Sequence, residues 1–265
     1  TYIMQIEISQ GIVEINIPKE YTKIGIKHSG GLDSTIILYM LALYKRDERP
    51  DIDIIPITII QNTKPFQWVY ASMGQRKITE LTGIEFGKHY FRAVDTEHVL
   101  IEQRKLVAYT YNNGIIDGHF YGITLNPPLD AFPDMSMRNL DRDVLYANET
   151  HPTIDLWEAT DETLIKTAGC SWRPLINIDK KGVCELYNKL GVLDELFPLT
   201  HSCENYNEHT LMQLDLSKHC GLKDCWWCQE RLWGFGKLDT LSKKQITPSP
   251  DEKETLLSKI AHFIR

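Results

Sequence analysis

Short apolar segments alternate with longer amphipathic segments through the first half of the chain. The short segments have the length of strands, and the longer ones place apolar residues at helical spacing. The predicted strands are Lys23–Lys27, Asp53–Ile60, His89–Val94 and His119–Ile123. The predicted helices are Asp33–Tyr44, Phe66–Leu81 and Thr96–Tyr111. This alternation predicts an α/β fold with a parallel sheet, in which ligands bind beyond the carboxyl ends of the strands.

The two flanks of this region have a different pattern. Before it, Tyr2–Ser9 and Gly11–Ile17 predict an N-terminal β-hairpin. After Pro152 the pattern becomes helical, and the predicted helices are Asp161–Thr167, Lys180–Leu190, Glu208–Leu216, Cys225–Leu238 and Glu254–Arg265. We therefore predict a main domain at residues 1–200, a helical lobe at 201–240, and a linker with a C-terminal docking helix at 241–265. The hairpin and the docking helix are candidate interfaces of a homodimer.

Composition narrows the class of protein. The 265 residues are 42% hydrophobic and 25% charged, with a net charge of −7, which excludes global disorder and argues against bulk binding of nucleic acid. The longest apolar run, Thr35–Tyr44, is too short to span a bilayer. The first residues lack the basic and apolar regions of a secretory signal. We expect a cytoplasmic protein that makes no contact with a membrane.

The clearest chemical motif is Ser29-Gly30-Gly31-Leu32-Asp33-Ser34, between a predicted strand and a predicted helix. Two glycines allow a tight backbone turn, so that several N–H groups converge at the positive end of the following helix. The two serines add hydroxyl donors, and Asp33 adds a carboxylate that suits a phosphate-bound Mg²⁺. A glycine-rich turn capped by Ser and Asp is the structural alternative, but the whole six-residue motif favours a phosphate-binding loop.

Four of the six cysteines lie close together late in the chain, and they are Cys203, Cys220, Cys225 and Cys228. Their number and spacing suit tetrahedral coordination of a structural zinc ion. A redox pair or a set of buried small side chains are the alternatives, and His201, His209 or His219 could replace one ligand. The other two cysteines stand apart, and Cys184 falls in an apolar helical pattern that is typical of a core residue.

The Ser29–Ser34 motif resembles the SGGxDS loop of the PP-loop ATP pyrophosphatase superfamily, which cleaves ATP between the α- and β-phosphates. Together with the cysteines, the chain resembles the 7-cyano-7-deazaguanine (preQ0) synthase family from about Lys23 to Phe235. The further matching segments, in chain order, are Gly122 after Phe120-Tyr121, Phe132-Pro133-Asp134, Pro174-Leu175, Lys180, Ser202-Cys203, Cys220-Gly221, Arg231 and Gly234-Phe235. The chain departs from the family at Met135 and Ser136, in Ile60–Thr63, and in the spacing of the cysteines.

This resemblance implies an adenine nucleotide α-hydrolase-like (PP-loop/HUP) domain with a C-terminal helical zinc-binding lobe. It implies a ligase that uses ATP, Mg²⁺ and ammonia to convert 7-carboxy-7-deazaguanine, a small-molecule deazapurine, into the nitrile, with release of AMP and pyrophosphate. The implied catalytic residues are Asp33 and Lys180, and the implied acceptor-binding residues are Pro133 and Asp134. The implied ATP-binding residues are Ser29, Gly30, Gly31, Leu32, Asp33, Ser34, Thr58 and Gly122.

Several alternatives stay open because the loop implies the use of ATP without selecting the acceptor. A divergent relative could stop at the amide, or could modify a protein or nucleic-acid terminus. A tRNA thiolation or lysidine enzyme would share the loop but would need an electropositive face. Binding of nucleotide without catalysis is a further alternative. Trp226 and Trp227 could stack on a base or pack against the metal lobe.

Overall fold

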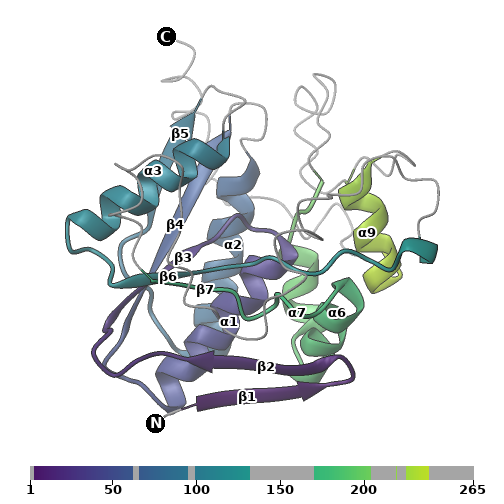
Figure 1. Cartoon of the computed structure of the whole chain (residues 1–265), viewed down its shortest axis with the longest axis horizontal. Coiled ribbons are helices and arrows are strands. Elements are labelled where there is room, and N and C mark those ends of the chain that lie inside the picture. Colours follow the sequence, from purple (N-terminus) through teal and green to yellow (C-terminus); the bar gives the residue numbers. More distant parts are fainter. Residues whose placement is uncertain are drawn as a thin grey trace.

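The computed structural model describes residues 3–61, 66–94, 99–131, 170–203, 219 and 225–238 (Figure 1). Its strands are β1 (Ile3–Ile8), β2 (Gly11–Asn16), β3 (Lys23–Lys27), β4 (Asp53–Gln61), β5 (Tyr90–Val94), β6 (Gly118–Tyr121) and β7 (Cys170–Trp172). Its α-helices are α1 (Leu32–Asp47), α2 (Phe66–Thr82), α3 (Val99–Asn112), α6 (Lys180–Lys189), α7 (Leu193–Leu196) and α9 (Trp226–Phe235). Two 3₁₀ turns, η1 (Leu129–Ala131) and η2 (Phe197–Leu199), complete the described elements.

Five strands form one parallel sheet in the order β5-β4-β3-β6-β7. The chain first moves outward from β3 to β4 and β5, and then returns to place β6 on the other side of β3. The carboxyl end of β3 is therefore the point at which the direction of winding reverses, and such switch points are where open α/β sheets bind their ligands. The predicted parallel α/β fold is confirmed, and β3 is its central strand.

Two hydrophobic clusters cover the two faces of the sheet. One cluster joins Ile24, Ile26 and Ile54 to the buried side chains of α1 and to Ile78 of α2. The other joins Ile55, Ile57 and Ile59 of β4 to Leu106 and Val107 of α3. Alternate residues of β4 thus pack on opposite helices, as expected for a strand that is buried on both faces.

The predicted N-terminal hairpin is also confirmed, as an antiparallel pair of β1 and β2. Figure 1 shows it running beneath α1 and α6. Its buried residues Val13, Ile15 and Ile17 belong to the same hydrophobic cluster as α1. Helix α1 therefore packs against the sheet on one side and the hairpin on the other, which explains why most of its side chains are apolar.

The structure differs from the sequence prediction in one strand and several boundaries. Strand β7 was not predicted because it has only three residues, which is too short for alternation to be visible. Helix α9 ends at Phe235 rather than Leu238, because Gly236 adopts a left-handed conformation with φ of 70° that stops the helix. The helices predicted at Asp161–Thr167, Glu208–Leu216 and Glu254–Arg265 lie outside the described residues.

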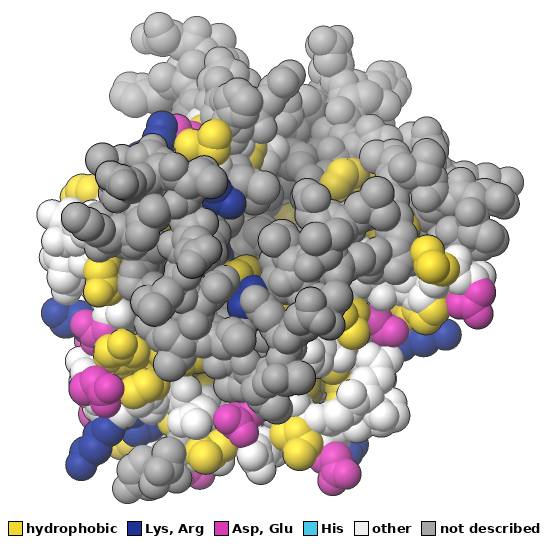
Figure 2. Space-filling model, in the orientation of Figure 1, with side chains coloured by type: hydrophobic (Ala, Val, Ile, Leu, Met, Phe, Trp, Pro, Cys, Tyr) yellow, Lys and Arg dark blue, Asp and Glu magenta, His cyan; other side chains and the backbone are white. Residues whose placement is uncertain are grey.

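The described helices and surface show two further features. None of these helices combines the length and apolar character that crossing a bilayer requires. On the face drawn in Figure 2, the described Lys and Arg side chains are interspersed with Asp and Glu side chains. The described part of this face therefore carries no stripe of a single charge.

Arg49 fixes the segment that leads from the hairpin into β3. Its side chain is buried, donates hydrogen bonds to the carbonyl groups of Ile17 and Tyr21, and pairs with Asp51 at 2.8 Å. A guanidinium group can satisfy several carbonyl groups at once, which a lysine or an apolar side chain cannot do.

We expect Arg49→Met to lower the free energy of unfolding by about 2–4 kcal/mol, because it leaves buried carbonyl groups without their donor. Urea denaturation would measure the change. Arg46→Met is the matched control, since Arg46 forms an exposed pair with Asp47 and should change stability by less than about 1 kcal/mol. Equal effects of the two substitutions would show that Arg49 does not anchor this segment.

Candidate functional site

The Ser29–Ser34 loop begins two residues after β3 and runs into the first turn of α1. It therefore lies at the carboxyl end of a strand, as the sequence predicted, and the strand order makes this end the switch point of the sheet. Gly30 has a φ of +74°, and a Cβ atom there would lie 2.6 Å from the backbone nitrogen of Ala71 and the Cβ of Tyr70. Both the backbone conformation and the contact with α2 require glycine at this position.

Hydrogen bonds within the loop hold its shape. The Ser34 hydroxyl group donates to the carbonyl group of Gly31, and it accepts a hydrogen bond from the backbone N–H of Ser29 at 3.2 Å. The backbone N–H of Gly31 donates to the Ser29 hydroxyl group at 3.3 Å. In the described structure no side chain caps the amino end of α1, so its first N–H groups are positioned to bind an anion.

The two predicted catalytic residues are in direct contact. Lys180 Nζ lies 2.6 Å and 2.5 Å from the two carboxylate oxygens of Asp33, and 3.4 Å from the Thr124 hydroxyl group. Asp33 belongs to the first turn of α1, and Lys180 is the first residue of α6. Lys180 is buried and is not a solvated surface lysine. The pair places one cation and one anion beside the Ser29–Ser34 loop.

Two glycines allow this ion pair to form. A Cβ atom at Gly122, just after β6, would lie 2.6 Å from the Cβ of Asp33. A Cβ atom at Gly234, in α9, would lie 2.5 Å from the Cβ of Lys180. Backbone therefore packs directly against each member of the pair. Gly122 packs against Asp33 and so shapes the loop, and its predicted binding of ATP stays a prediction.

The predicted ATP-binding residue Thr58 takes part in an internal network. Its buried hydroxyl group donates to the carbonyl group of His28 at 2.5 Å. The single hydroxyl proton is then used, so the 2.7 Å contact with His89 Nε2 makes that nitrogen the donor. His89 Nδ1 accepts from Gln75 at 3.0 Å, which is consistent with this tautomer. The network fixes the backbone immediately before Ser29.

His28 precedes the loop and is fully buried. Its Nε2 donates to the carbonyl group of Ala71 in α2 at 3.0 Å. Burial lowers the pKa of His28 to about 4, so the ring is neutral at physiological pH. His28 thus joins the end of β3 to α2 without placing a charge behind the loop.

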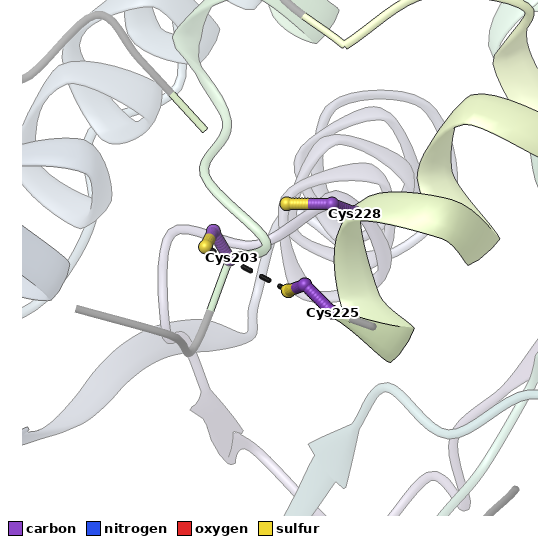
Figure 3. A group of neighbouring side chains, drawn as sticks. All are labelled: Cys203, Cys225 and Cys228. Atoms are coloured by element: carbon purple, nitrogen blue, oxygen red, sulfur yellow. Dashed lines mark hydrogen bonds between the residues drawn. The ribbon is translucent and has the colours of Figure 1, made fainter. Parts of the chain in front are cut away.

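Three of the four predicted metal ligands come together. Cys203, Cys225 and Cys228 are buried, and their sulfur atoms all lie within 4.8 Å of one another (Figure 3). The sulfur atoms of Cys203 and Cys225 are 3.9 Å apart. Thiolates bound to one tetrahedral zinc ion at about 2.3 Å are separated by roughly 3.8 Å, so this arrangement fits a metal ion. Cys220 lies outside the described residues.

The described histidines near this group do not belong to it. His219 Nε2 accepts a hydrogen bond from the backbone N–H of Ser202 at 3.1 Å, and its ring stacks on that of His201. Trp226 is buried, and Trp227 packs against the three cysteines. The tryptophans therefore serve the packing of this lobe.

The segment at residues 200–203, which ends at Cys203, also contacts the Ser29–Ser34 loop, and the sequence did not predict this contact. The backbone N–H of His201 donates to the carbonyl group of Gly30 at 2.9 Å. The buried Arg231 of α9 donates to the hydroxyl groups of Thr200 and Ser202 at 2.9 Å and 3.2 Å. Residues 200–203 are thus held between α9 and the loop. The proposed acceptor-binding residues Pro133 and Asp134 lie outside the described residues.

No protein-family model matches the chain, and no curated protein matches it. Among solved structures, the chain is similar to the U34-tRNA thiolase NcsA from Methanococcus maripaludis with its 4Fe-4S cluster, at 15% sequence identity and a TM-score of 0.41. That match covers 91% of this chain and 71% of the other chain. The function must therefore be inferred from the site itself.

The two loop glycines give a matched test of the loop geometry. We expect Gly30→Ala to lower the free energy of unfolding by about 2 kcal/mol or more, because a side chain there is strained and clashes with α2. Gly31→Ala should cost less than about 1 kcal/mol, since its φ is −82° and the nearest atoms to a new Cβ are 3.3 Å and 3.6 Å away. Thermal and urea unfolding of both variants would measure the difference, and equal losses would contradict the loop conformation.

Proposed function

We propose that the protein is an ATP-dependent adenylating enzyme that releases AMP and pyrophosphate. The observation that carries this proposal is the SGGLDS loop at the switch point of the sheet, with the Asp33–Lys180 pair at its edge. Converging N–H groups and a helix amino end suit the binding of pyrophosphate. The loop does not have the GxxxxGK[ST] pattern of NTPases that transfer the γ-phosphate.

The chain's own residues account for most of the chemistry that adenylation requires. Attack of an acceptor oxygen on the α-phosphate needs a fixed orientation and neutralisation of the charge on the leaving pyrophosphate. The loop would orient the β- and γ-phosphates, and Lys180 would neutralise charge beside it. Asp33 would hold Mg²⁺, which supplies further charge neutralisation when bound. The ion pair keeps both side chains in place before the substrates bind.

For the acceptor, we propose 7-carboxy-7-deazaguanine, with ammonia as the nucleophile that displaces AMP. The oxygen of the resulting amide would then attack the α-phosphate of a second ATP with release of pyrophosphate, and loss of AMP from this adenylated amide would give the nitrile. This choice rests on the order of matching segments between Lys23 and Phe235. A related enzyme that stops at the amide, or that adenylates another acceptor, is the alternative that the departures at Met135 and Ser136 favour.

We further propose that Cys203, Cys225 and Cys228 bind zinc, with Cys220 as the fourth ligand. Their mutual distances and burial support this set. Zinc held there would have a structural role, because it would fasten the segment that contacts Gly30 to the start of α9. The thiolates would be fully used in coordination, and no part of the reaction would pass through the metal.

The first test of the proposed reaction is the identity of the products. We expect ATP, Mg²⁺, ammonium and 7-carboxy-7-deazaguanine to give AMP, pyrophosphate and a product that mass spectrometry identifies as the nitrile or the amide. Lys180→Met and Asp33→Asn should each lower kcat/KM by about 100-fold or more, because the first removes the cation that would neutralise phosphate charge and the second removes the carboxylate that would hold Mg²⁺. Lys181→Met is the matched control and should retain activity, since Lys181 lies over Trp233. Release of ADP and phosphate would exclude adenylation.

The metal proposal has a separate test. We expect freshly purified protein to contain about one zinc ion per chain, measured by mass spectrometry of the metal. Cys228→Ser should remove most of the zinc and lower the melting temperature, whereas Cys184→Ser should do neither, because Cys184 lies within α6 and packs against the main hydrophobic cluster, not with the three cysteines. Iron and sulfide in place of zinc, or a metal content near zero, would overturn the assignment.

A further inference from the structure

A group of polar side chains lies on the face of the sheet that α3 covers. Lys27 on β3 pairs in register with Tyr121 on β6, and His119 pairs with Ser171 on β7. Residues two apart on a strand share a face, so these four side chains project from the same side. Arg104 of α3 is close enough to act on the charge of Lys27. We call Lys27, Arg104, His119, Tyr121 and Ser171 the β3–β6–β7 cluster.

Two atoms of this cluster have unmet hydrogen-bonding capacity. His119 and Ser171 are 4% and 1% exposed. Within the described part of the chain, His119 Nδ1 and Ser171 Oγ have no hydrogen-bond partner. Buried polar atoms are nearly always satisfied by protein, water or a ligand. The neighbouring part of the same face, over β4 and β5, is filled instead by an apolar cluster. On this face of the sheet, the polar groups are thus concentrated over β3, β6 and β7, and the apolar groups over β4 and β5.

The charges of the cluster favour an anion. Burial and the nearby Arg104 lower the pKa of Lys27 to about 7, and burial and Lys27 lower the pKa of His119. Among the described residues, the groups that face Lys27 include Arg104 from α3, His119 and the ring of Tyr121 from β6, while Ile57 of β4 is apolar. A bound oxyanion would offset the repulsion between the cations and accept hydrogen bonds from the Ser171 hydroxyl group and the His119 ring.

The cluster also lies at the carboxyl edge of the sheet, which is the edge at which the Ser29–Ser34 loop lies. Lys27 precedes Ser29 by two residues, and Tyr121 immediately precedes Gly122, which packs against Asp33. Lys27 and Tyr121 are therefore at the carboxyl ends of their strands, beside the phosphate-binding loop but on the opposite face from α1. A molecule seated there would lie beside the loop on the opposite face of the sheet from α1.

We propose that the β3–β6–β7 cluster binds an oxyanion, a carboxylate or a phosphate group, that is carried by the acceptor molecule. This proposal rests on the proposed function, in which the neighbouring loop activates that acceptor with ATP. It names a specificity site on this chain that is separate from the loop, and it gives the acceptor a net negative charge before it is adenylated.

Calorimetric titration without ATP tests the site directly. Benzoate and inorganic phosphate are the two probes, because they separate a carboxylate from a phosphate. At pH 8, binding should take up nearly one proton per anion, because an adjacent anion raises the pKa of Lys27 above the pH of the solution. Repeating the titration in two buffers that differ in ionisation enthalpy measures this uptake, which phosphate bound at the backbone of the loop would not produce.

Variants assign the uptake to the cluster. Lys27→Met should abolish proton uptake and weaken binding at least tenfold, and Ser171→Ala should weaken it by about threefold to tenfold. Lys23→Met is the matched control, since Lys23 lies on the same face of β3 at its exposed amino end. Lys27→Met should not unfold the protein, because a buried lysine with a lowered pKa opposes folding at every pH below its value in the unfolded chain.

The outcomes distinguish failure of the anion site from failure of the proposed adenylation reaction. Binding of either probe with Lys27-dependent proton uptake supports the site and identifies the preferred oxyanion, even if the enzyme assay shows no AMP. Failure of both probes to bind in the millimolar range overturns the site, as does equal binding by the wild type and Lys27→Met. Formation of AMP with unchanged acceptor KM in Lys27→Met would keep the proposed function and exclude the cluster from acceptor binding.

Discussion

The Asp33–Lys180 ion pair joins parts of the chain that are 147 residues apart, and the site depends on it. It connects the amino end of α1 with the amino end of α6, so these two distant helices are joined by a charged contact. Both side chains are largely removed from water, and such a pair is favourable only when its geometry is fixed. Gly122 and Gly234 provide that geometry, because each lets backbone approach where a side chain would push the pair apart.

Local patterns were sufficient to predict most of the fold. Strand β3, the start of α2 and the start of α6 agree with the sequence prediction because each coincides with a clear change in apolar spacing or a cap. Asp179, for example, caps α6 by accepting hydrogen bonds from the N–H groups of Lys181 and Gly182. Strand β7 was not predicted because three residues are too few to show periodicity. Its pairing with β6 also depends on contacts between residues distant in the chain.

The site was predictable in its residue types but not in its contacts. The loop motif identified Ser29–Ser34, and the family order identified Lys180, yet nothing in the sequence indicates that Lys180 reaches Asp33. The roles of Arg231 and His201 depend on the same kind of distant contact. Thr58 was predicted to bind ATP, but in the structure its hydroxyl group forms internal hydrogen bonds with His28 and His89. The sequence did not reveal these internal partners. The β3–β6–β7 cluster could not be predicted from the sequence, in which its one unusual feature is Lys27 at the end of a strand with apolar residues.

The hydrogen bond from His201 to Gly30 also affects the electrostatic potential at the loop. A backbone carbonyl group carries a partial negative charge, which repels phosphate when it faces the ligand. The N–H of His201 donates a hydrogen bond to the carbonyl oxygen of Gly30, so a phosphate group bound at the loop, as we propose, would meet less repulsion from that oxygen. The segment before Cys203 therefore helps to decide the sign of the local potential. If that segment moved away, the same turn would attract phosphate less strongly, although none of its own residues had changed.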